Sequence, residues 1–143
     1  MRKKSEAQVF LESVERIDAR ITCKLIEKQQ WRDLALGITA KMDGDRVQSS
    51  GASDKIGNAV GRCVDIEAEI DALIDNLVET KKEVIQTIEQ LYSPTEFKLL
   101  HLRYIQYVPL KDIADRWGVE YTNVTTTHGR ALRNVQEILD RRS

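Results

Sequence analysis

The sequence of 143 residues contains little of what a disulfide scaffold, a metal site or a membrane span would need. It has two cysteines and two histidines, and neither Cys23 nor Cys63 has a second cysteine or a histidine at metal-ligand spacing. No apolar run reaches the length of about 18 residues that spans a bilayer, and the basic start MRKKSEAQ lacks the apolar core of a signal peptide. We therefore expect a cytoplasmic protein with no metal, no cofactor and no membrane partner.

Proline is also scarce, with two residues, and no one sign of charge dominates, because 22 Lys and Arg nearly balance 23 Asp and Glu. A charged fraction of 31% with so little proline favours long solvated helices over a sandwich or a barrel. A chain of this length can form one compact domain, or one small domain with an extension. The net charge of −1 argues neither for nor against nucleic acid as a partner.

Catalytic motifs are missing as well. The chain has no glycine-rich phosphate loop, no H-E-x-x-H sequence and no cysteine–histidine pair at a recognisable spacing. His101 and His128 fall on different predicted helices, where we expect them to be surface or interface residues. Cys23 and Cys63 occupy apolar positions of helical patterns, and we expect both to be small buried hydrophobic residues. The sequence therefore predicts a protein that is not an enzyme.

Helical periodicity is what the first two thirds of the chain do contain. Apolar residues at spacings of three and four predict one amphipathic helix over about residues 5–42. They are Phe10, Val14, Ile17, Ile21, Leu25, Ile26, Trp31, Ala35, Ile38 and Met42.

A second pattern predicts a helix over about residues 54–91 and is close to a heptad repeat. Its positions are Ile56, Val60, Cys63, Ile66, Ile70, Leu73, Leu77, Val84, Ile88 and Leu91. Residues 43–53, DGDRVQSSGAS, have the composition of a loop.

Charge predicts how the two helices pair. Residues 1–42 carry nine Lys and Arg against six Asp and Glu, whereas residues 54–92 carry four against nine. A basic helix folded back on an acidic one is an electrostatically favoured antiparallel hairpin, similar to a coiled coil. In such a hairpin Cys23 and Cys63 lie at different levels, which excludes a disulfide between them. A homodimeric parallel coiled coil through these helices is the alternative that the sequence leaves open.

The pattern changes at Ser93, where the last third of the chain begins. SPTE is a capping box with proline at the first helical position, so a new helix begins here. It should stop before Pro109, because the residue that precedes a proline is pushed out of helical geometry. A second helix starts at Pro109 and ends at Gly118, a natural C-terminal stop. A third begins near Glu120.

The third helix starts with EYTNVTTTHGRAL, a stretch rich in residues of low intrinsic helix propensity. Apolar and threonine positions nevertheless recur at helical spacing, so the stretch is one part of an amphipathic helix. They are Val124, Thr127, Ala131, Leu132, Val135, Ile138 and Leu139. The outward side chains are then Tyr121, Thr122, Asn123, Thr125 and Thr126. The fold class that we predict is all-α, with a helical hairpin over residues 1–92 and a three-helix module over residues 93–143.

Two helices joined by a short turn with glycine, the second with a polar and weakly charged outer face, are typical of a DNA-reading helix-turn-helix. Asparagine can pair with adenine, and threonine offers a hydroxyl and a methyl group to base edges. We therefore assign base reading in the major groove of double-stranded DNA to the five outward residues named above. Phosphate contacts are assigned to Lys111, Arg130 and Arg133, with Arg141 and Arg142 further along the helix.

The run SPTEFKLLHLRYIQYVPLKDIADRWGVEYTNVTTTHGRAL resembles region 4 of bacterial sigma-70-type factors. The matching features are the capped first helix, the LRY sequence, the L-x-x-I-A pattern, the W-G-V turn and the closing R-A-L. Together with the long helices and the VQSS sequence, this module resembles small phage-borne regulators, including late transcriptional activators of the ArpU and RinA type. The resemblance implies a DNA-binding transcriptional regulator of phage or prophage origin.

The sequence departs from the sigma pattern on the predicted reading face. Sigma factors usually place arginine and glutamate there, whereas this face is neutral, so their promoter specificity is not carried over. Thr127 stands where the family usually has an apolar residue, and Gly129 where alanine is common, which predicts a softened helix that firms up on DNA. Two alternatives stay open: a DNA-packaging protein like a small terminase subunit, which would form a large ring, and a sigma-like module whose outer face binds RNA polymerase.

Overall fold

The computed structural model describes residues 3–44 and 50–143, and within these ranges it contains helices and no strand. The helices are α1 (Glu6–Gly44), α2 (Ser50–Ile88), α3 (Pro94–Leu100), α4 (Leu110–Trp117) and α5 (Tyr121–Arg142), with a π-helical turn η1 (His101–Ile105) directly after α3. The prediction of an all-α protein is therefore confirmed. Across the part of the chain that is described, no helix has the length and apolar character needed to cross a membrane.

The chain divides into two compact units, and the division falls inside the two long helices. Unit 1 comprises Met1–Ile17 and Leu77–Ser143, and unit 2 comprises Asp18–Asn76. The boundary that we predict between residues 92 and 93 lies within unit 1. The first residues of α1 and the last turns of α2 thus pack with the three C-terminal helices.

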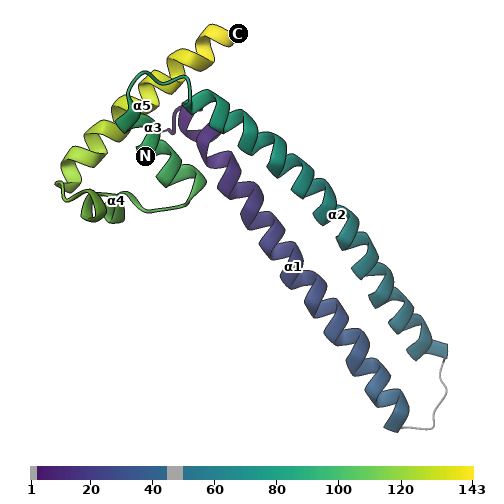
Figure 1. The fold of residues 1–143 in the computed structure, drawn as a ribbon. Coiled ribbons are helices and arrows are strands. Elements are labelled where there is room, and N and C mark those ends of the chain that lie inside the picture. Colours follow the sequence, from purple (N-terminus) through teal and green to yellow (C-terminus); the bar gives the residue numbers. More distant parts are fainter. Residues whose placement is uncertain (1–2, 45–49) are drawn as a thin grey trace. The chain divides into compact units, whose positions relative to one another are not determined.

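Unit 2 consists of the parts of α1 and α2 that lie within Asp18–Asn76, and the two helices run side by side and antiparallel (Figure 1). Ion pairs between described residues cross from one helix to the other. Lys24 Nζ lies 2.8 Å from a Glu69 oxygen, Lys28 Nζ lies 2.6 Å from a Glu67 oxygen, and Arg62 Nη2 lies 3.0 Å from a Glu27 oxygen. Because these pairs are partly exposed they contribute little stability each, but they favour the antiparallel register. Among the side chains of unit 2 that the structure describes, the buried apolar ones are Ile21, Ala59, Ile66 and Ile70.

Helix α2 begins earlier than the sequence predicts. It starts at Ser50, not near residue 54, and the glycines at positions 57 and 61 lie inside it. Helix propensity is low in this stretch, and residues 51 and 53–55 are exposed, so the added turn has no buried side chain among them. Extension of a helix that is already formed avoids the cost of nucleation. Helix α1 extends to Gly44. The remainder of the predicted loop, residues 45–49, lies outside the described residues.

The two cysteines are free, and their environments differ. Cys63 is partly buried, and its Sγ lies 3.7 Å from the carbonyl oxygen of Lys28 on α1. Cys23 is exposed, so the prediction that both thiols are buried is wrong for this residue. Ile21 faces the interior of unit 2, and a residue two positions later on a helix points about 200° away from it.

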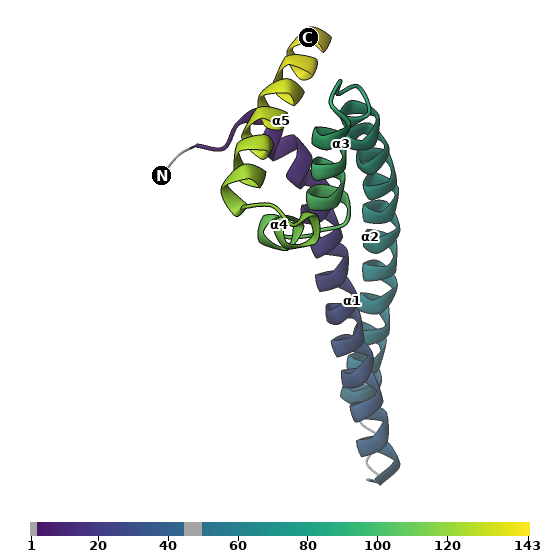
Figure 2. The same cartoon turned by 60° about the vertical axis from the view of Figure 1, so that its left-hand side comes forward.

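The core of unit 1 joins the hairpin helices to the C-terminal helices (Figure 2). Its buried residues come from α1, α2, α3, η1 and α5: Ala7, Leu11, Val14, Val84, Ile88, Leu100, Tyr104, Ala131 and Val135. Polar contacts support this packing. The backbone N–H of Ala7 donates to Gln136 Oε1 at 2.9 Å, and Arg103 Nη1 lies 3.7 Å from a Glu15 oxygen. Helix α5 is thereby held against the start of α1.

Helix α3 begins at the predicted cap. The Ser93 hydroxyl accepts a hydrogen bond from the backbone N–H of Glu96 at 3.3 Å, and Pro94 occupies the first helical position. The Glu96 side chain is buried and accepts a hydrogen bond of 2.6 Å from Asn134 Nδ2 on α5. The same short sequence therefore starts α3 and ties it to α5.

Candidate nucleic-acid interface

The surface predicted to read DNA is built on α4, α5 and the turn between them. Helix α4 ends where Gly118 adopts a left-handed φ of 64°, with its N–H directed at the carbonyl oxygens of Ala114 and Asp115. Glycine adopts this conformation without steric cost. The N–H of Val119 donates to Ala114 O at 3.1 Å, and α5 begins at Tyr121. The predicted end of one helix and start of the next are confirmed.

A small apolar core fixes how α5 is rotated. Its buried members are Leu99, Val108, Ile113, Ala114 and Val124, with Leu102, Leu110 and Trp117 packed around them. Val124 is the residue that α5 contributes, and it is 2% exposed. Since Val124 points inward, residues two positions before and after it must point to the opposite side of the helix. Figures 1 and 2 both show α4 beside the N-terminal half of α5.

The predicted site residues lie on the outer surface of α4 and α5, and all but one of them are exposed to solvent. Tyr121, Thr122, Asn123 and Thr126 are exposed, whereas Thr125 is partly buried at the edge of the face. The three residues assigned to phosphate are also exposed: Lys111 on α4, and Arg130 and Arg133 on α5.

Helical spacing arranges these residues in lines. The central line of the outer face has spacings of four, three and four residues, which keep side chains on one side of a helix. It consists of Thr122, Thr126, Gly129 and Arg133. Asn123 and Arg130 are seven residues apart, close to two turns, and form a second line beside it. The first turns of α5 are thus uncharged on the outside, and the basic residues follow. We call this surface the reading face.

Hydrogen bonds within α5 limit what the threonines can offer. The hydroxyls of Thr125 and Thr126 both donate to the carbonyl oxygen of Thr122, at 2.9 and 2.8 Å. The hydroxyl of Thr127 donates to Asn123 O at 2.9 Å. A hydroxyl has a single hydrogen, so these three side chains present a methyl group and acceptor lone pairs to their surroundings. The sequence alone predicts threonines on this face, but not which of their groups is available.

Gly129 leaves the middle of the reading face shallow. A methyl group added at this position would meet only Arg133 Nη1, at 3.9 Å. The backbone here is helical with negative φ, so no turn geometry requires glycine. Its absent side chain lets another surface approach the α5 backbone closely.

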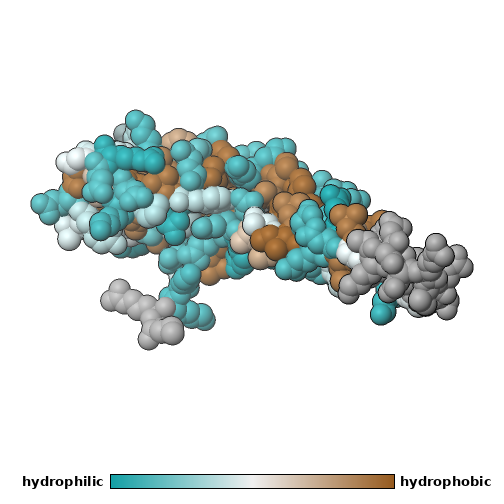
Figure 3. Space-filling view, turned by 90° about the horizontal axis from the view of Figure 1, so that it is seen from below, coloured by the Kyte–Doolittle hydropathy of each residue, from teal (hydrophilic) through white to brown (hydrophobic). Residues whose placement is uncertain are grey.

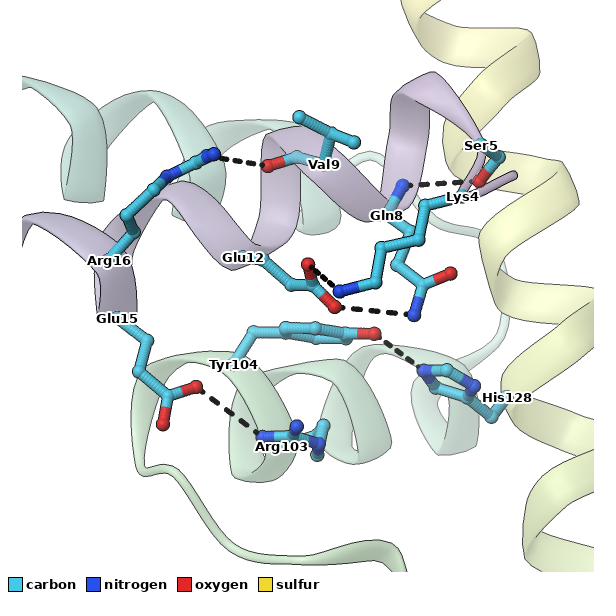
Figure 4. A network of polar contacts seen from close by, with 10 residues as sticks. All are labelled: Lys4, Ser5, Gln8, Val9, Glu12, Glu15, Arg16, Arg103, Tyr104 and His128. Carbon is cyan, nitrogen blue, oxygen red and sulfur yellow. Dashed lines mark hydrogen bonds and ion pairs between the residues drawn. The ribbon is translucent and has the colours of Figure 1, made fainter. Parts of the chain in front are cut away.

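Behind the reading face, His128 anchors α5 to the core of unit 1 (Figure 4). Its Nε2 lies 2.7 Å from the Tyr104 hydroxyl, and the two rings stack with centroids 5.7 Å apart. The Arg103 guanidinium lies 5.3 Å from the centre of the Tyr104 ring. Figure 4 shows Glu12 of α1 across the ring from Arg103, where Lys4 Nζ lies 2.8 Å from a Glu12 oxygen.

The surroundings of this pair shift both of its titrating groups. Burial, and then the charge of Arg103, lower the pKa of His128 below its usual value, against an opposing effect of Glu12. Burial raises the pKa of Tyr104 to about 12. The neutral imidazole is therefore favoured near pH 7, where its ring nitrogen can pair with the protonated phenol.

Sequence reasoning missed the contacts that position α5. Asn134 bonds Glu96, and Gln136 bonds both the Ala7 backbone and, through Nε2 at 3.3 Å, a Glu6 oxygen. A signal was present, because both amides flank Val135, a position of the apolar stripe. Polar residues beside a buried stripe often bond to a neighbouring element. Their partners lie far away in the chain, and periodicity carries no information about them.

Comparisons of the chain with protein-family models, with curated proteins and with solved structures find no match. The resemblances to sigma-70 region 4 and to phage regulators therefore stay predictions based on the sequence run itself. The geometry of the reading face and its chemistry are what a functional assignment can rest on.

Proposed function

We propose that the chain is a sequence-specific transcriptional regulator that binds double-stranded DNA and places the N-terminal half of α5 in the major groove. One observation carries the proposal. Val124 is buried against α4, while the opposite side of α5 exposes Thr122 and Thr126 and continues into Arg133. Uncharged hydrogen-bonding side chains followed by guanidinium groups suit base edges and then phosphates.

The dimensions of the two partners agree with this placement. An α-helix with its side chains is about 10–12 Å across, and the major groove of B-DNA is about 12 Å wide. Asn123 supplies the amide that can bond two atoms of an adenine. Arg130 and Arg133 follow on the same helix, and Lys111 stands on α4, so cations flank the uncharged residues.

In this proposal α4, the turn and α5 form a helix-turn-helix of the sigma-70 region 4 type, and α1 and α2 form the antiparallel hairpin that precedes it. The regulator would belong to the phage late-activator type that the sequence resembles. Residues 93–143 carry eight Lys and Arg against six Asp and Glu, a small excess. Nonspecific affinity depends on counterion release by cations, so we expect it to be weak and the cognate site to matter.

Selection of genomic DNA fragments by the purified full chain tests the proposal. We expect the bound fragments to share a short sequence. A variant with Thr122, Asn123 and Thr126 all changed to alanine should lose this enrichment. The matched control is a variant with Thr22→Ala and Gln29→Ala, which changes exposed polar residues of unit 2. It should keep the enrichment. Bound fragments that share no sequence beyond the input would contradict the proposal.

RNA polymerase is the alternative partner for the same face, and the same variants separate the two. If the triple-alanine variant bound the selected DNA as tightly as the unchanged chain but lost transcriptional activity, the reading face would contact a protein. Loss of DNA binding together with activity supports the DNA-reading assignment.

A further inference from the structure

Unit 2 carries a second apolar surface besides the stripe that joins α1 to α2. Leu36 of α1 is 62% exposed, and Val60 and Val64 of α2 are 50% and 59% exposed. All three line one open groove of about 400 Å³ between the helices, together with Ile56 and Cys63. In Figure 3, apolar side chains (brown) reach the surface among hydrophilic ones (teal). Exposure of several large apolar side chains around one groove is typical of an interaction surface.

The apolar surface continues along both helices. Leu25 precedes Leu36 by eleven residues, close to three turns, and is 51% exposed. Ile74 follows Ile56 by eighteen residues, which is five turns, and is 43% exposed. The sequence assigned Leu25, Ile26 and Val60 to the stripes that pair the two helices, and their exposure corrects that assignment. These residues belong to a face that the pairing of α1 with α2 leaves uncovered.

The charges on this face suit contact with a second copy of the same face. Arg32 lines the groove from α1, and Glu67 lines it from α2. Residues 18–37 carry four Lys and Arg against three Asp and Glu, whereas residues 54–76 carry two against six. A two-fold axis parallel to the helices would place each α1 beside α2 of the second copy. Within one chain Glu67 pairs with Lys28, which lies one turn before Arg32 on α1. Because rotation about such an axis preserves the level along the helices, it would set Arg32 of each chain within about one turn of Glu67 of the other.

We propose that this face of unit 2 binds a second copy of the chain, and that the two hairpins form a four-helix assembly with like helices on the diagonals. Each apolar face then covers the other, and every neighbouring pair of helices combines a basic with an acidic one. The proposal goes beyond DNA binding and depends on unit 2 alone, so it stands or falls separately from the proposed function.

Sedimentation of the full chain tests the proposal through a matched pair of leucines. We expect twice the mass of 16.4 kDa at micromolar concentration. Leu36→Glu should raise the dissociation constant by roughly tenfold or more, because the charge is placed in an apolar contact. Leu34→Glu, which changes a leucine 51% exposed outside the groove, should leave it unchanged. Val64→Glu gives a second disruption if Leu36→Glu loses helical circular dichroism.

A single chain at all concentrations, a large ring, or equal effects of Leu36→Glu and Leu34→Glu would overturn the proposal.

A second experiment tests how the two hairpins are oriented relative to each other. Arg32→Glu and Glu67→Arg should each weaken self-association, since each sets like charges opposite one another in both contacts. Mixing the two variants should restore two-chain particles, because both contacts between the different chains then join opposite charges. Absence of restoration in the mixture would overturn the diagonal arrangement.

Discussion

Thr125, Thr126 and Thr127 each use their hydroxyl hydrogen within α5. On the reading face, Thr126 can therefore give a base a methyl contact or an acceptor, but not a donor. The thymine methyl group accepts apolar contact from such side chains, and the amino groups of adenine and cytosine can donate to the lone pairs. Because the lone pairs accept from both amino groups, the methyl contact alone would favour A·T base pairs opposite the first turns of α5 in the proposed complex.

Replacement of thymine by uracil in the selected site removes one methyl group from the base and so tests the proposed methyl contact. A contacted methyl contributes about 0.8 kcal/mol on burial, so its removal should weaken binding about fourfold. Binding titrations should show this loss for the unchanged chain and for Thr126→Val, which keeps a methyl at the same place. Thr126→Ser should be nearly insensitive to the replacement. Equal sensitivity of the valine and serine variants would contradict the methyl contact.

His128 makes the stability of unit 1 depend on pH. Its pKa is lowered in the folded chain, so near pH 6.5 the unfolded state binds more protons than the folded state. The free energy of unfolding should therefore fall as the pH drops through 6.5 toward the folded pKa. Denaturant unfolding between pH 8 and pH 5 measures it, and His128→Gln should flatten the curve. A slope that is the same in both proteins would show that His128 does not carry the effect.

At the scale of elements, α5 combines a weak N-terminal half with a well-packed C-terminal half. Its first turns contain the back-bonded threonines and Gly129, whereas Ala131, Val135 and Ile138 are buried. Threonines that bond the preceding turn slightly destabilise a helix, and glycine costs about 1 kcal/mol relative to alanine. The weak half coincides with the reading face.

Gly129→Ala tests two features of this half of α5: its weakness as a helix and the close approach that the missing side chain allows. The added methyl meets nothing closer than 3.9 Å, so we expect the folded chain to gain up to about 1 kcal/mol in stability. Amide exchange over residues 121–131 should slow, while affinity for the selected site falls because the helix backbone can no longer approach as closely. Full protection of residues 121–131 in the unchanged free chain would contradict the softened helix.

Local chemistry explains which element boundaries the sequence could predict. Ser93 with Pro94, Pro109 and Gly118 each fix a helix end through their own side chain or backbone, and the structure places ends at these residues. The start of α2 at Ser50 was missed because residues 43–53 have the composition of a loop. The exposure of Cys23 was missed for another reason: the line along which two helices contact each other is a tertiary property.

At the scale of the whole molecule, charge predicts the pairing of the long helices, whereas the boundary between residues 92 and 93 is predicted from the capping box at Ser93. Opposite charges on α1 and α2 do form ion pairs, such as Lys24 with Glu69. These contacts lie within one chain, and they favour the hairpin over a parallel coiled coil. The division into units depends on contacts between distant segments, such as Ala7 with Gln136, which no local pattern encodes.

The exposure of the candidate residues could be predicted from a local pattern. Inward and outward positions on α5 follow from helical periodicity once Val124 is recognised as buried, and the role of the outward residues in reading DNA stays a prediction. Availability of the threonine hydroxyls, the shallow centre at Gly129 and the anchor at His128 require atomic positions. These features bear on the affinity and the base preference that the proposed function predicts.

The ratio of affinities for the selected site and for random DNA tests the central claim most directly. Asn123→Ala should lower binding of the selected site by about 1–3 kcal/mol and leave random DNA unaffected. Arg133→Ala should weaken both alike and reduce the salt dependence by about one counterion. If both variants changed the two affinities equally, α5 would not be reading sequence, and the account given for this surface would be wrong.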